Sequence, residues 1–132
     1  MRKYYLFIVK EKYKNQNVFN TLNNLYNIRE NNLLYGVKLF HEICELFDKK
    51  IISSYLEVRF KTIKNIKKNQ YYLNGYQEQD LIVLKKSAVI IITNLNFPLI
   101  LRTFNIYNRN IFVCDFENRD YFWLDNMVLN HK

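Results

Sequence analysis

Residues 111–124, IFVCDFENRDYFWL, form two apolar runs joined by a polar turn. The runs 111–116 and 121–124 are rich in aromatic and β-branched side chains, which favour strands. Residues 117–120 are all polar and suit an exposed turn. The segment therefore predicts two strands joined by a turn near the end of the chain.

The segments before it continue this pattern of strands and turns. Residues 80–84 and 88–93 are both β-rich and flank Lys85-Lys86-Ser87, which predicts a hairpin. Residues 98–107 are amphipathic with Pro98 in the first turn, which predicts a helix. Asn74-Gly75 is the strongest short turn signal in the chain.

The first half of the chain predicts one strand followed by helices. Residues 4–9, YYLFIV, read as a buried strand, and Asn17 is a suitable N-cap for a helix over 18–26. Residues 30–48 carry a long apolar stripe at helical spacing. Residues 51–68 fit both periods, and we expect a helix there or a short strand running into one.

This order predicts one domain over residues 1–132, of the α+β class. We expect one mixed or antiparallel sheet packed by about three to four helices. The 132 residues include only two Gly and one Pro, which leaves no linker and no Gly-rich phosphate loop.

Cysteine usage and apolar runs indicate the compartment. Cys44 and Cys114 lie in apolar contexts, which predicts two buried free thiols. No run approaches the ~20 apolar residues of a membrane span, and the N-terminus lacks the pattern of a signal peptide. We therefore expect a cytoplasmic protein.

Catalytic groups are sparse. His41 and Cys44 fall on one predicted helix, where a structural role is the better reading. The acidic residues Asp115, Glu117, Asp120 and Asp125 surround the polar turn and could hold Mg²⁺. Solvation of the turn explains them better, so we expect no enzyme activity, no metal and no cofactor.

The net charge of +8 lies in residues 1–70, which hold 14 Lys and Arg against six Asp and Glu. Such an excess attracts nucleic acid or an acidic protein. The segment 59–72 combines clustered lysines with Tyr71 and Tyr72, which could stack on bases. It contains no recognised nucleic-acid motif, so nucleic-acid binding stands as the alternative to a protein interface.

The two ends of the chain carry a more specific signal. The opening YYLFIVKEKY and the closing FVCDFENRDYFWLDN resemble the corresponding ends of the SirA family, the sporulation inhibitors of replication. The resemblance implies a single α/β domain that binds the N-terminal domain of the initiator DnaA. Binding would keep the initiator from assembling at the origin, without a reaction or cofactor.

The same resemblance implies a partner-binding surface. Its contacts would come from Tyr13 and Asn17 after the first strand, from Tyr35 and His41 on the long helix, and from Asn126 in the tail. Asn17 stands where the family pattern has an aromatic residue, and Asn126 where it has proline. Nearby lysines would add a basic rim: Lys10, Lys12, Lys14 and Lys38.

Overall fold

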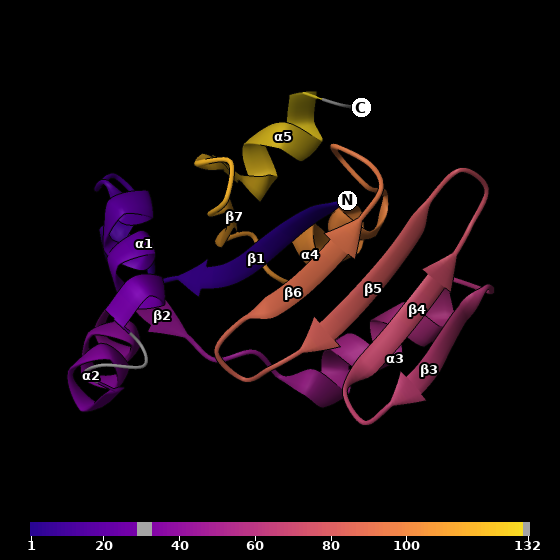
Figure 1. Cartoon of the computed structure of the whole chain (residues 1–132), viewed down its shortest axis with the longest axis horizontal. Helices are drawn as coiled ribbons and strands as arrows, with labels where there is room; N and C mark the ends of the chain where they lie inside the picture. The colour runs from indigo at the N-terminus through magenta and orange to yellow at the C-terminus, as the bar shows by residue number, and fades with distance from the viewer. Residues whose placement is uncertain (29–32, 131–132) are drawn as a thin grey trace.

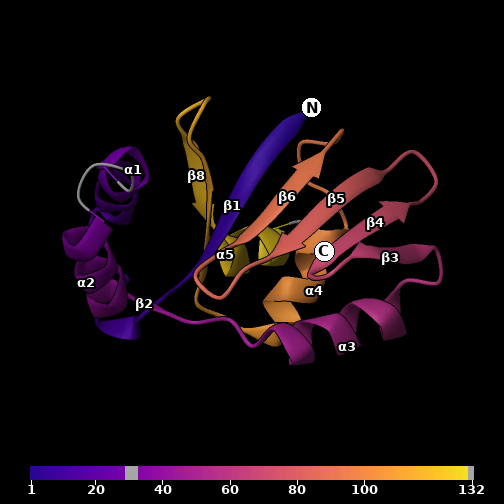
Figure 2. The same ribbon diagram turned by 60° about the horizontal axis from the view of Figure 1, so that its bottom comes forward.

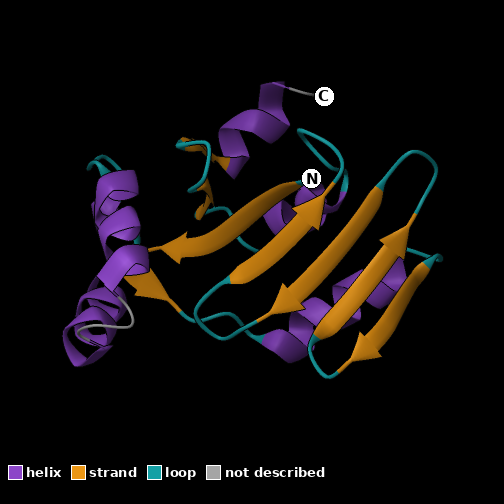
Figure 3. Cartoon of the chain, in the orientation of Figure 1, coloured by secondary structure: helices purple, strands orange, loops and turns teal. Residues whose placement is uncertain are grey.

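One antiparallel sheet runs through the protein in the computed structural model, which describes residues 1–28 and 33–130 (Figures 1 and 3). Its strand order is β3-β4-β5-β6-β1-β7-β8, and the short β2 pairs with β1. The strands are β1 (Arg2–Val9), β2 (Cys44–Glu45), β3 (Ile63–Lys67), β4 (Gln70–Asn74), β5 (Gln79–Leu84), β6 (Val89–Thr93), β7 (Ile111–Asp115) and β8 (Asp120–Trp123). The helices are α1 (Val18–Ile28), α2 (Leu33–Ile43), α3 (Lys49–Arg59), α4 (Ile100–Tyr107) and α5 (Leu124–Asn130), with a 3₁₀ turn η1 (Glu11–Tyr13). The α+β prediction with a helix-packed sheet is confirmed.

The first strand lies at the centre of the sheet. β1 pairs with β6 through Arg2 to Leu6 and with β7 through Tyr5 to Ile8. Its side chains alternate between two apolar cores, one on each face of the sheet. This position explains why YYLFIV is apolar throughout instead of alternating with polar residues.

One face of the sheet is covered by α3, α4 and α5, as Figure 2 shows. Tyr4, Leu6 and Ile91 from the sheet pack there against Leu56 of α3 and Phe104 of α4. All five side chains are buried. This is the larger of the two cores.

The other face is covered only in part. Val18, Phe19 and Leu22 of α1 pack on Tyr5 and Phe112 over the β1–β7 side of the sheet. Among the described helices, none lies over the same face of β3 to β6, which is turned toward the viewer in Figure 1. An antiparallel sheet can leave one face open in this way.

The helix predicted over 30–48 is shorter than expected, and its predicted start lies outside the described residues. It ends at Ile43, and Cys44–Glu45 forms β2 against Ile8 and Val9 of β1. β6 reaches only as far as Leu6 along β1. The remaining backbone groups of β1 on that side therefore pair with β2, and this demand outweighs the helical spacing.

The helix expected in 51–68 is present as far as Arg59, but the alternative of a strand that runs into a helix is wrong. A helix comes first, α3, and the strand β3 follows it. The Asp48 carboxylate accepts hydrogen bonds from Lys50 N and Ile51 N, so a new helix is capped at the residue where the predicted helix 30–48 was expected to end. β4 and α5 were also not predicted, and β4 ends at the Asn74-Gly75 turn.

The remaining elements agree with the sequence. The strand at 4–9, the helix after Asn17, the 80–93 hairpin, the helix after Pro98 and the final strand pair are all present. Both cysteines are buried and free, and burial raises the pKa of the two thiols, that of Cys44 to about 12. None of the described helices has the length and apolar character needed to cross a bilayer.

Candidate partner-binding surface

The segment after β1 is held by capping and by a link to α2. Asn17 Oδ1 accepts a hydrogen bond from Asn20 N at 3.4 Å, so the predicted N-cap of α1 is confirmed. The Tyr13 hydroxyl donates to Glu42 Oε1 of α2 at 3.2 Å. Lys10 Nζ donates to the His41 carbonyl oxygen at 2.7 Å. These contacts fix Tyr13 beside the end of α2 that carries His41.

Asn17 and Asn126 come from opposite ends of the chain and line the same hollow. The hollow has a volume of about 540 Å³ and lies between the start of α1, β8 and the start of α5. Both asparagines are exposed, and Asn15 and Gln16 add further polar groups to its rim. The structure therefore brings together two of the five predicted contact residues.

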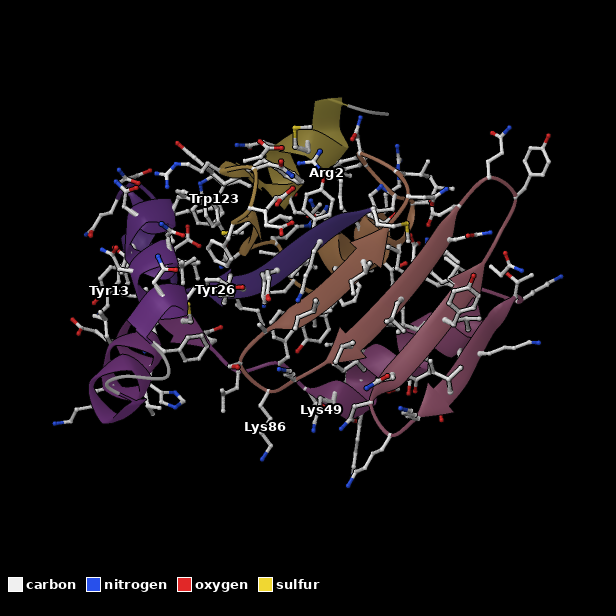
Figure 4. All side chains as sticks on the ribbon, viewed as in Figure 1. Arg2, Tyr13, Tyr26, Lys49, Lys86 and Trp123 are labelled. Carbon is white, nitrogen blue, oxygen red and sulfur yellow. The ribbon has the colours of Figure 1, made fainter. Side chains whose placement is uncertain are left out.

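Aromatic side chains line the inside of this hollow. Tyr121 stacks on Phe19 with ring centroids 4.5 Å apart, and it remains 51% exposed. Trp123 packs on Phe112 at 4.8 Å, with Lys14 Nζ 5.8 Å from its ring centre. Figure 4 shows Tyr13 and Trp123 at the end of the molecule formed by α1 and α2.

Sequence reasoning missed Tyr121 and Trp123 because their strand was read as scaffold only. The antiparallel register with β7 places Tyr121 opposite Cys114 and Trp123 opposite Phe112. Asn126 lies at the start of α5, so the tail after Trp123 turns back over the hollow as a helix. The apolar run 121–124 was the available signal, but it did not reveal which face was open.

His41 belongs to a different hollow. Its exposed side chain lines an apolar groove of about 480 Å³ between α1, α2 and the β5–β6 turn. The groove floor includes Tyr5, Phe7 and Ile90. The backbone of Tyr35 is part of α2, and its side chain lies outside the described residues.

The acidic residues of the β7–β8 turn converge on an arginine. Asp115 and Asp120 are direct partners in the strand register, and Arg2 Nη2 lies 3.1 Å from Asp115 Oδ2 and 2.8 Å from Asp120 Oδ2. Burial acts to raise the pKa of Asp115, but hydrogen bonds from Asn118 and Arg2 lower it below its usual value. Within residues 1–28 and 33–130, no group of three or more His, Cys, Asp or Glu could hold a metal ion.

The basic segment 59–72 is divided between two faces. Tyr71 is only 5% exposed and packs in the core under α3, so it cannot stack on a base. Tyr72 lies on the opposite, open face and is half-buried. The pair of stacking tyrosines expected from the sequence is therefore reduced to one.

Comparisons with known proteins add no family. The chain matches no family model, and a search of curated proteins finds no similar sequence.

Proposed function

We propose that this protein inhibits the initiation of DNA replication by binding the N-terminal domain of the initiator DnaA. The SirA-like ends of the chain name the partner, and the shared hollow of Asn17 and Asn126 is the observation that carries the proposal. In the proposed complex the protein covers a surface that the initiator uses to assemble at the origin. It acts in the cytoplasm and needs no cofactor.

The hollow has the features of a protein interface. The exposed Tyr121 and the half-buried Trp123 supply apolar area with a polar tip, and such residues dominate binding energy in many complexes. The amides of Asn17 and Asn126 can donate and accept hydrogen bonds at its rim. Lys10, Lys12 and Lys14 precede α1 and give this side a positive potential, which speeds encounter with an acidic partner.

Tyr13 gives the first test. We expect Tyr13→Ala to weaken binding to the initiator domain by about 1–3 kcal/mol, because an interface tyrosine loses both ring and hydroxyl. Isothermal titration of the full chain with purified DnaA N-terminal domain measures this. Tyr13→Phe keeps the ring and loses only the bond to Glu42, so it separates partner contact from support of α2.

Two further variants keep this test independent of folding. Asn126→Ala should also weaken binding, while Tyr76→Ala should not, since Tyr76 is 92% exposed in the β4–β5 turn outside the hollow. The proposal is wrong if the wild-type chain shows no binding. It is equally wrong if Tyr13→Ala and Asn126→Ala bind like Tyr76→Ala.

A further inference from the structure

The open face of β3 to β6 carries apolar side chains. Tyr71, Leu73, Ile82 and Ile91 point into the core under α3 and α4. Because side chains alternate along a strand, Tyr72, Leu81, Val83, Ile90 and Ile92 point to the opposite face. Tyr72, Leu81, Val83 and Ile92 are half-buried there.

The register orders this face into rows with lysines at the ends. One row runs across five strands as Lys64, Tyr72, Leu81, Ile92 and Lys3, each residue directly opposite the next. Its three central apolar residues span about 10 Å, since neighbouring strands lie about 4.8 Å apart. That width matches the diameter of one α-helix, about 10 Å.

The neighbouring row leads into the apolar groove beside α2. It runs Lys67, Gln70, Val83, Ile90 and Tyr5, again as directly opposed partners. Ile90 and Tyr5 also form part of the groove floor. The row and the groove therefore form one continuous apolar surface.

The groove adds cations to one side of this surface. Lys85 and Lys86 of the β5–β6 turn line it, and both are exposed.

Lysines lie around this surface. Lys64 and Lys3 end one row, Lys67 begins the other, and Lys85 and Lys86 line the groove. Glu78 and Asp80 at the start of β5 are buried, and Glu117 lines a small hollow together with Lys3 at the far edge. A partner that covers the apolar rows meets lysines on both sides.

We propose that this open face binds an acidic amphipathic helix of a partner protein. The helix would lay its apolar stripe on Tyr72, Leu81 and Ile92 and pair its carboxylates with Lys64 and Lys3. A second copy of this chain fits poorly, because it would oppose the same lysines across the contact. Single-stranded nucleic acid also fits poorly, since Leu81, Val83 and Ile92 offer no aromatic ring for stacking.

This inference goes beyond the proposed function. Its surface includes none of Tyr13, Asn17 and Asn126, which contact or line other parts of the molecule. The two proposals can therefore fail separately.

The test uses the full chain labelled with ¹⁵N and a synthetic helical peptide of about 18 residues, or five turns. The peptide carries Leu on one face and Glu on the other. A second peptide of the same composition has its Leu residues spread around the helix. We expect only the first to shift the amide signals of Tyr72, Leu81 and Ile92, at about 0.1 M salt.

Matched variants locate the contact. Leu81→Gln and Lys64→Glu should each weaken peptide binding by roughly fivefold or more, as loss of an interface contact does. Leu99→Gln and Lys50→Glu make the same changes at exposed positions of the helix layer on the other face, and should leave it unchanged. All four variants should bind the DnaA domain like the wild type, which keeps this test separate from the first.

Several results would overturn the inference. One is equal binding of the two peptides, or no binding of either. Another is tighter binding of a dodecamer of thymidine to the same residues, which would assign the face to nucleic acid. A third is a dimer through this face in sedimentation at about 0.1 M salt.

Discussion

At the scale of single residues, Asp80 is a buried acid whose two carboxyl oxygens both lack an ordinary hydrogen-bond partner among the described residues. It is fully buried next to Glu78, whose Oε1 accepts a hydrogen bond from Leu99 N at the start of α4. Neither Asp80 oxygen has a hydrogen bond of ordinary geometry to the described residues, although Glu78 and Thr93 are close enough to affect its titration. Burial and the Glu78 carboxyl raise the pKa of Asp80 to about 8, against the opposing effect of Thr93.

Asp80 therefore predicts a loss of stability as the pH rises. Between its ordinary pKa of 3.8 and about 8, the folded state holds a proton that the unfolded state releases, so the free energy of unfolding falls across this range. Asp80→Asn keeps the shape and removes the titration. We expect it to raise Tm at pH 8.5 by roughly 4 °C or more, about 1 kcal/mol for a domain of this size, and to have little effect near pH 4.

Thermal melts over this pH range check the prediction, with Glu117→Gln as the control. Glu117 is exposed in the β7–β8 turn, so removing its charge should shift Tm little at any pH. A gain from Asp80→Asn that does not grow with pH would contradict the assignment of Asp80.

The ion pair between Arg2 and Asp115 predicts the opposite dependence on pH, a loss of stability as the pH falls. Arg2→Met leaves a buried carboxylate without its cation and should lower the free energy of unfolding by about 2 kcal/mol. This loss is smaller than for a fully buried pair because the Arg2 side chain is 24% exposed and its charge is partly solvated. The effect should disappear as the pH falls below 3.8, because a protonated Asp115 no longer needs the guanidinium.

Urea unfolding of a matched pair measures this effect. Arg109→Met breaks another 2.8 Å ion pair, to Asp125, but the Arg109 side chain is 70% exposed. That variant should lose less than about 1 kcal/mol. Equal losses in the two variants would show that burial of Asp115 does not matter.

At the scale of elements, sequence patterns identified strands whose neighbours are close in the chain. The 80–93 hairpin and the 111–124 strand pair were predicted because each includes its own turn. β4 was missed because Asn69, at φ 64°, turns the chain just before it, and no Gly marks that turn. β2 was missed because its partner, β1, lies far away in sequence, so no local pattern records the pairing.

The cap of α3 offers a test of one element. Asp48 Oδ1 accepts from two backbone N–H groups, so Asp48→Ala should destabilise the protein by about 1 kcal/mol in urea unfolding. Asp48→Asn keeps an accepting oxygen and should cost much less. If the two variants are equally destabilised, the carboxylate acts through its charge instead of as a cap.

At the scale of the whole molecule, the sequence predicted the uneven charge but not its relation to the two faces. Only the resemblance of the chain ends predicted that Asn17 and Asn126 share a surface, because no sequence spacing links two residues so far apart in the chain. The register of β8 on β7 places Tyr121 and Trp123 in the same hollow as these two asparagines, and the sequence does not reveal that register. The open face was hidden for the same reason, since its apolar residues read as ordinary strand interior.

The open face and the net charge of +8 make opposite demands on the free protein. An uncovered apolar surface favours self-association, while the lysines around it repel a second copy. Screening by salt decides which effect is stronger: charges interact over about 10 Å at 0.1 M salt but over only about 3 Å at 1 M.

We therefore expect a monomer in sedimentation equilibrium at 0.1 M sodium chloride and a measurable dimer at 1 M. Association driven by charge pairing would show the reverse dependence on salt. Leu81→Gln should abolish the dimer and Leu99→Gln should not, because Leu99 lies outside the open face. A dimer that forms at low salt and dissociates at high salt would mean that charge pairing, and not the apolar rows, holds two copies together.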